Sequence, residues 1–207
     1  MSADHDHAVT FDGMNDDYKR RLLLVTAINI GMFVIELLGG QLAGSQALKA
    51  DALDFLADGA TYALSFWAIG KPVRVRAGAA FLKGLSLFAM GLWVGGSTLY
   101  QFLVLGVPRA EVMSLIGILA LCANLGSVWL LMSYKDGDAN IRSVWLCSRN
   151  DAIGNVAVVG AALFVALLGN GVPDLIVAGV MAALFLSSSF QILRLSWAEW
   201  RHAGHGH

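Results

Sequence analysis

The feature that most constrains this chain of 207 residues is a series of six apolar stretches, each long enough to cross a lipid bilayer. The hydrocarbon core of a bilayer needs about 20 apolar residues in one helix. Turn residues and charges separate the stretches, which predicts an all-α polytopic membrane protein with six transmembrane helices. The predicted spans are residues 21–43, 46–70, 77–102, 112–133, 144–168 and 173–195.

The composition agrees with a membrane protein and excludes soluble enzymes, nucleic-acid-binding proteins and disordered proteins. Hydrophobic residues make up 57% of the chain and charged residues only 14%, whereas a soluble domain carries roughly 25% charged residues. The formal net charge of −1 gives no reason to expect a nucleic acid as a partner. Both cysteines, Cys122 and Cys147, lie within apolar stretches, so a disulfide framework is not expected.

The distribution of Lys and Arg predicts the direction of insertion, because cytoplasmic loops carry an excess of both residue types. Ten of these residues lie on the side of the two termini, whereas Lys49 and Arg109 lie on the opposite side. We therefore expect both termini in the cytoplasm and the protein in the cell (inner) membrane. The expected organisation is a disordered cytosolic tail over 1–18, the six-helix domain over 19–197 and a short cytosolic tail over 198–207.

Four polar residues occupy positions in the second and fifth spans that a bilayer normally excludes. Asp54 and Asp58 are four residues apart, as are Asp151 and Asn155, so each pair shares one helix face. Counted along the helices, both pairs reach the middle of the bilayer. Two adjacent carboxylates repel each other unless they are protonated or bridged by a cation. Oxygen ligands at this spacing predict a site for a divalent metal ion, with Asn155 or a water molecule completing it.

Other residues are open to two interpretations each. Cys147 either adds a thiolate ligand to the metal site or only packs near the cytosolic end of its span. Asp51 either forms an outer relay point or pairs with Lys49 or with a backbone group. Glu36 either lines the outward path or has a structural role, and Lys83 either extends to the headgroups or pairs with an inner carboxylate. All histidines are terminal and either capture metal or belong to unstructured tails: His5, His7, His202, His205 and His207.

The stretches Ile35–Gly40 and Gly44–Asp58, together with residues of span five, form a pattern that resembles the cation diffusion facilitator family. In that family one half of the transport site is His or Asp followed four residues later by Asp, and Asp54 and Asp58 match these positions. In span five, Asp151 matches the second position of the other half. The first position falls on Cys147, which departs from the family.

The resemblance implies six helices, a homodimer, and export of Zn²⁺, or of Cd²⁺ or Co²⁺, in exchange for protons, with no enzymatic reaction and no resident cofactor. The family's C-terminal cytoplasmic domain is expected to be absent. Two alternatives remain, namely a proton-coupled transporter of another small cation and a non-transporting membrane subunit that binds or senses metal. Glycines of span three indicate a packing face toward either a second subunit or another helix: Gly84, Gly91, Gly95 and Gly96.

Overall fold

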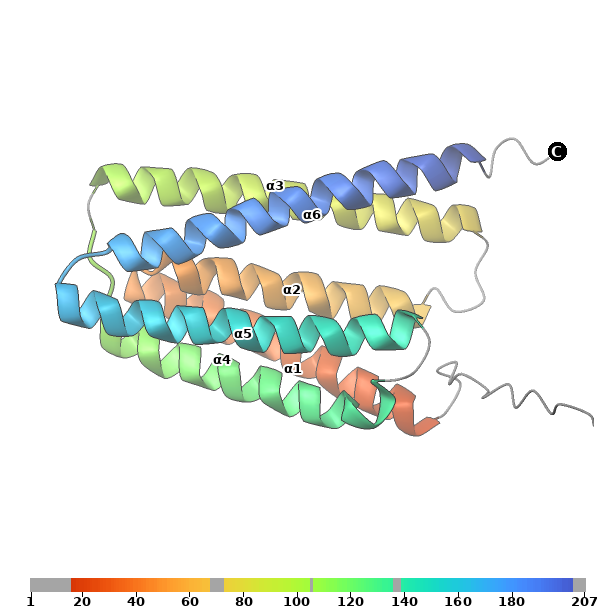
Figure 1. Ribbon diagram of the computed structural model, residues 1–207, viewed down its shortest axis with the longest axis horizontal. Coiled ribbons are helices and arrows are strands. Elements are labelled where there is room, and N and C mark those ends of the chain that lie inside the picture. Colours follow the sequence, from red (N-terminus) through yellow and green to blue (C-terminus); the bar gives the residue numbers. More distant parts are fainter. Residues whose placement is uncertain (1–15, 68–72, 105, 136–138, 203–207) are drawn as a thin grey trace, which may run out of the picture.

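The computed structural model describes residues 16–67, 73–104, 106–135 and 139–202. Within these ranges the chain forms six α-helices and one 3-10 turn, with no β-strand, so the all-α fold class is confirmed (Figure 1). The elements are α1 (Asp16–Ala43), α2 (Gln46–Trp67), α3 (Val73–Val104), α4 (Ala110–Leu131), η1 (Met132–Tyr134), α5 (Ala139–Leu168) and α6 (Val172–His202).

Five of the helices, α1, α3, α4, α5 and α6, are long and apolar enough to cross a membrane. Large apolar side chains cover the outside of the bundle; Leu103 is 72% exposed and Phe190 is 69% exposed. A continuous apolar exterior of this kind suits contact with lipid rather than with water. The exception among the helices is α2, whose 22 residues include Lys49, Asp51, Asp54 and Asp58.

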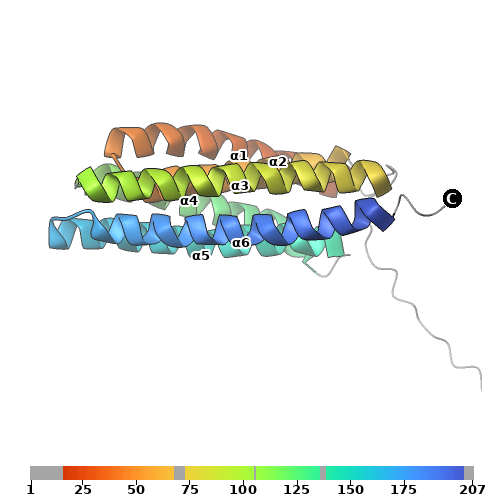
Figure 2. The same ribbon diagram turned by 90° about the horizontal axis from the view of Figure 1, so that it is seen from above.

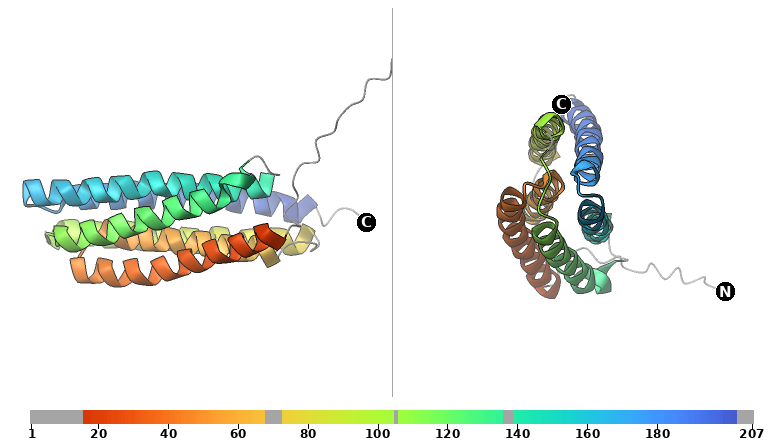
Figure 3. Two further views of the ribbon diagram at one scale, coloured as in Figure 1. Left: turned by 90° about the horizontal axis from the view of Figure 1, so that it is seen from below. Right: turned by 90° about the vertical axis from the view of Figure 1, so that its left-hand side faces the viewer.

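The helices run alternately in opposite directions along the long axis of the molecule (Figures 1 and 2). Asp16 and His202, where the described chain begins and ends, therefore lie at the same end, which we call the terminal end; the opposite end is the distal end. Viewed along the axis, α3 and α6 form a pair at one side of the bundle (Figure 3). α2 packs against α1, α3, α5 and α6, and its residues Asp51 and Asp58 are buried.

Glycines allow α3 and α6 to approach each other closely. A Cβ atom on Gly84 would lie 2.9 Å from the Leu193 side chain, and one on Gly91 would lie 2.9 Å from that of Leu186. These two glycines therefore form a packing face within the bundle, as small residues do between membrane helices. A Cβ atom on Gly96 would meet nothing within 4 Å, so this glycine does not take part in the contact.

At the distal end, Ser45 and Asp174 form a buried cap on the first turn of α2. The Leu48 N–H donates to Ser45 Oγ at 3.0 Å, which makes Ser45 the N-cap residue. Ser45 Oγ in turn donates to Asp174 Oδ1 at 2.6 Å. The backbone N–H groups of Gln46 and Ala47 donate to the same carboxylate at 2.8 and 3.0 Å. This α2 cap fastens the start of α6 to the start of α2.

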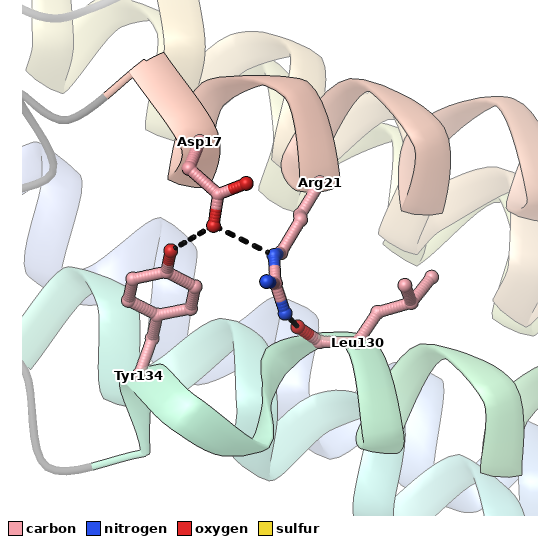
Figure 4. Close-up of polar contacts among 4 residues, drawn as sticks. All are labelled: Asp17, Arg21, Leu130 and Tyr134. Carbon is pink, nitrogen blue, oxygen red and sulfur yellow. Dashed lines mark hydrogen bonds and ion pairs between the residues drawn. The ribbon is translucent and has the colours of Figure 1, made fainter.

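At the terminal end, polar contacts join α1 to the end of α4 (Figure 4). The Tyr134 hydroxyl donates to Asp17 Oδ2 at 2.6 Å, and Arg21 Nε donates to the same oxygen at 2.9 Å. Arg21 also donates to the Leu130 carbonyl at 3.0 Å, one of the last carbonyls of α4. These contacts hold the start of α1 against the end of α4.

Two of the expected tail boundaries differ from the structure. α1 begins at Asp16, so residues 16–18 are helical; two acidic residues in this first turn favour the helix start. α6 continues to His202, five residues beyond the predicted end of the helical domain. His5, His7, His205 and His207 lie outside the described residues, and the side chain of His202 is not described.

Candidate metal-ion site

The predicted site residues of α2 and α5 line one cavity of about 380 Å³, which lies in the half of the bundle nearer the terminal end. Asp54 and Asp58 come from α2, and Cys147 and Asp151 come from α5. Lys83 of α3 and apolar residues of α6 complete the walls. Four of the five residues predicted as metal ligands therefore face one space, which opens between four helices.

The three aspartates form a compact acidic group, which we call the Asp cluster (Asp54, Asp58 and Asp151). The Asp151 side chain lies within hydrogen-bonding reach of both Asp54 and Asp58. The spacing of four residues places Asp54 and Asp58 one turn apart on the face of α2 that meets α5. Carboxylates from two different helices therefore converge, as an oxygen-coordinated divalent ion requires.

Among the described residues, no three His, Cys, Asp or Glu side chains are already arranged as a complete metal site. The ligand set of the Asp cluster with Cys147 therefore stays a prediction. One physical obstacle is visible in the structure, since an oxygen of Asp58 is already engaged in a hydrogen bond with Tyr62. A bound ion would need the Asp58 carboxylate to turn or to offer its other oxygen.

Tyr62 contacts the site but is not among the residues predicted from the sequence. Its hydroxyl donates to Asp58 Oδ2 and lies 3.3 Å from Ser148 Oγ on α5. The Tyr62 side chain is 0% exposed, and Ser148 is buried as well. Spacing is the sequence feature that could have revealed Tyr62, because it lies four residues after Asp58, just as Asp58 lies four residues after Asp54.

Asn155 behaves differently from the other predicted ligands. It does not line the cavity, and it is fully buried. Neither its side-chain oxygen nor its nitrogen has a hydrogen-bond partner within the described part of the chain. The structure thus places Asn155 in the bundle interior without bringing it to the cavity wall, and its role as a ligand stays a prediction.

Lys83 lines the cavity instead of extending to the membrane surface. Its ammonium group interacts electrostatically with Asp54 and Asp58. It is not within ion-pair distance of either, since the ion pairs in the described ranges are Asp16–Lys19 and Asp17–Arg21. Lys83 therefore supplies positive charge to a space lined by carboxylates.

Glu36 and Asp51 lie together on the distal side of Asp54, and both are buried. Asp51 and Lys49 form no ion pair within the described part of the chain. Residues two apart on a helix point to different faces, and Lys49 interacts with Asp174 instead.

Comparison with known proteins agrees with the resemblance seen in the motifs. The sequence model of the cation efflux transmembrane domain matches residues 22–199. The zinc transporter ZitB of Escherichia coli is 28% identical over 209 residues, covering 94% of this chain and 67% of ZitB.

More distant relatives carry broader names. The cadmium, cobalt and zinc/H(+)-K(+) antiporter of Bacillus subtilis is 27% identical over 195 residues, covering 87% of this chain and 63% of the relative. The metal cation efflux system protein CzcD of Cupriavidus metallidurans is 26% identical over 212 residues, covering 95% and 64%. The chain thus spans about two thirds of the length of these curated relatives.

Proposed function

The chain belongs to the cation efflux family, also called cation diffusion facilitators, and from this premise we propose that it exports divalent transition-metal ions from the cytoplasm. The single observation that carries the proposal is the cavity in which Asp54, Asp58 and Asp151 converge from two helices. Zn²⁺ is the proposed main substrate, because the relatives include a zinc transporter and an antiporter of cadmium, cobalt and zinc. Cd²⁺ and Co²⁺ are proposed as further substrates.

In this proposal all six helices cross the inner membrane, including α2. Its charged residues are tolerated because four other helices surround it. The terminal end faces the cytoplasm, in agreement with the excess of Lys and Arg on that side. Metal ions then enter the cavity from the cytoplasm.

We propose that the structure describes the inward-facing state of the transporter. A cluster of buried apolar residues of α1, α2, α4 and α5 fills part of the distal half. The members of this cluster are Ala43, Ala47, Leu48, Met113, Val158, Ala161 and Ala162. Transport requires this distal half to open while the terminal half closes.

Charge balance gives the Asp cluster and Lys83 complementary tasks. Without metal, the Lys83 ammonium and bound protons offset the negative charge of the carboxylates, because uncompensated charge inside a membrane is costly. A divalent ion displaces these protons, since carboxylates must be deprotonated to act as ligands. Protons that return from the distal side then favour release of the ion, which makes the exchange an antiport.

Zinc flux into proteoliposomes that contain a zinc-sensitive dye tests the proposal. We expect rapid flux for the unmodified protein and a loss of about tenfold or more for Asp58→Asn, equivalent to at least 1.4 kcal/mol. The matched control is Glu111→Gln, which neutralises an exposed acidic residue in the first turn of α4. Zinc binding without flux would instead indicate a non-transporting metal subunit, and proton flux without metal flux would indicate another cation as substrate.

A further inference from the structure

Glu36 of α1 and Asp51 of α2 form a second acidic group, separate from the Asp cluster. Glu36 is 0% exposed and Asp51 is 2% exposed. Their carboxyl groups lie within hydrogen-bonding reach of each other. Neither residue lines the cavity that holds the Asp cluster.

Close packing of α1 against α2 brings the two carboxyl groups together. A Cβ atom on Gly40 would lie 2.9 Å from the Lys49 side chain, and one on Gly59 would lie 2.8 Å from that of Ile30. These two contacts flank the Glu36–Asp51 pair along the helices. The approach of the helices is therefore fixed on both sides of the pair, and the carboxyl groups cannot separate without disturbing it.

The surroundings of the pair supply no hydrogen-bond donor to three of its four side-chain oxygens. Both side-chain oxygens of Glu36 and Oδ2 of Asp51 are buried and accept no hydrogen bond from any described group. The charged residue that interacts with both is Asp54, which is also acidic. On α4, which packs against α1, the titratable residues Glu111 and Cys122 are exposed and do not face the pair.

Two ionised carboxylates in contact are strongly disfavoured in such a place unless a cation lies nearby. Each would lose its hydration without gaining a donor, and the two negative charges would repel each other. A single proton reduces both costs, because one carboxyl group becomes neutral and donates an O–H···O hydrogen bond to the other. Such charge-assisted bonds are among the stronger ones in proteins.

We propose that Glu36 and Asp51 together bind one exchangeable proton and form a second site of the counter-ion in transport, in addition to the protons displaced at the Asp cluster. This inference rests on the proposed export of metal ions. Asp51 lies three residues before Asp54 on the same side of α2. A divalent ion at Asp54 therefore adds positive charge next to the pair and weakens proton binding there. The carboxyl O–H bond breaks, its electron pair stays on the oxygen and the proton passes to water.

Calorimetry tests this assignment by counting the protons released when Zn²⁺ binds. The count follows from comparing the heat of binding in two buffers with different heats of ionisation. For Glu36→Gln we expect about one proton fewer per bound ion, because the new amide donates permanently to Asp51 in place of the proton. We expect the same loss for Asp51→Asn. Zinc flux in both variants should continue but should respond less steeply to an imposed pH gradient, because the protons displaced at the Asp cluster remain.

Two further variants act as controls for this measurement. Glu36→Asp keeps a titratable group and should retain the released proton, so it separates loss of the acid from loss of packing. Glu111→Gln removes an exposed carboxylate and should release as many protons as the unmodified protein. If Glu36→Gln binds Zn²⁺ and releases an unchanged number of protons, the proposed proton site is wrong.

Infrared spectroscopy separates failure of this inference from failure of the proposed function. A difference spectrum between low and high pH, recorded without metal, reports the C=O stretch of a buried protonated carboxyl group. We expect a band that Glu36→Gln removes and Glu111→Gln keeps. Its presence in a protein that neither binds nor transports Zn²⁺ would overturn metal export and leave a proton-binding pair. Its absence from the unmodified protein would overturn the pair itself.

Discussion

At the scale of single residues, the Tyr62 hydroxyl connects the metal-ion site on α2 to α5. It donates a hydrogen bond to Asp58 Oδ2 and lies against Ser148 of the neighbouring helix. Because Asp58 lines the cavity and Tyr62 does not, the tyrosine acts on a bound ion through the aspartate. We regard Tyr62 as a positioning residue that fixes the direction in which Asp58 presents its free oxygen.

Replacing Tyr62 by Phe should weaken the apparent affinity for Zn²⁺ by about three- to tenfold, because one hydrogen bond of about 1 kcal/mol no longer orients Asp58. The maximal rate should change much less, since no ligand is removed. Concentration-dependent flux in proteoliposomes measures both quantities. Tyr134→Phe is the matched control, because it removes a tyrosine–aspartate bond at the terminal end of the bundle, outside the cavity. Equal effects of the two substitutions would contradict a specific role for Tyr62.

How much of the site the sequence could predict depends on whether a contact lies within one helix or between two. The spacing of Asp54 and Asp58 fixes their common face, and the structure places them in the cavity. The contact of Tyr62 with Ser148 and that of Glu36 with Asp51 depend on how far one helix is shifted along another. Glycine contacts set this shift, and helical periodicity carries no information about it.

At the scale of secondary-structure elements, the α2 cap explains how a helix with a polar face keeps a fixed end. The Asp174 carboxylate accepts one hydrogen bond from a hydroxyl and two from backbone N–H groups, and these bonds compensate its buried negative charge. It also joins α2, which carries the metal-ion site, to α6. Both helices border the cavity, so the relative position of its walls depends on this junction.

Substituting Asp174 by Ala should lower the free energy of unfolding by about 2–4 kcal/mol, because the change removes a cap and leaves buried donors unsatisfied. Equilibrium unfolding in mixed micelles measures the loss. Glu111→Ala, which removes an exposed acidic residue from the first turn of α4 at the same end, should change stability by less than about 0.5 kcal/mol. A small effect of Asp174→Ala would show that the cap bonds add little to the helix contacts.

The predicted spans locate the helices correctly but misplace their ends. α3, α5 and α6 extend beyond the apolar stretches that predict them. Membrane length limits the apolar part of a helix only, whereas hydrogen bonding continues into polar residues as long as no Gly or Pro interrupts it. Gly44 and Gly169, which follow α1 and α5, have φ angles of +71° and +64° and mark ends that composition does reveal.

At the scale of the whole molecule, the alternating helices place Asp16 and His202 at one end. Three exposed tryptophans lie near the same end, namely Trp67, Trp129 and Trp197, whereas the exposed Trp93 lies further along α3. Tryptophan is enriched at the interface between membrane and water. The molecule therefore has a recognisable interfacial zone at its terminal end, which agrees with the direction of insertion inferred from Lys and Arg.

Cysteine labelling of intact cells tests this orientation. In a background with Cys122→Ala and Cys147→Ala, we introduce Val107→Cys between α3 and α4 or Lys135→Cys at the end of α4. Both positions are exposed but lie at opposite ends of the bundle. A membrane-impermeant maleimide should label Val107→Cys in intact cells and Lys135→Cys only after permeabilisation. The reverse pattern would place the cavity on the outside and contradict export from the cytoplasm.

The α2 cap holds α6 at the distal end, so the α3–α6 pair can act as a lever that pivots there. α6 contains 31 residues, which at 1.5 Å per residue make a rod of about 46 Å. A tilt of about 10° around the distal end would move the other end of such a rod by roughly 8 Å and its midpoint by roughly 4 Å. The second displacement exceeds the diameter of a water molecule, so a small rotation far from the aspartates is enough to open or close a path one water molecule wide.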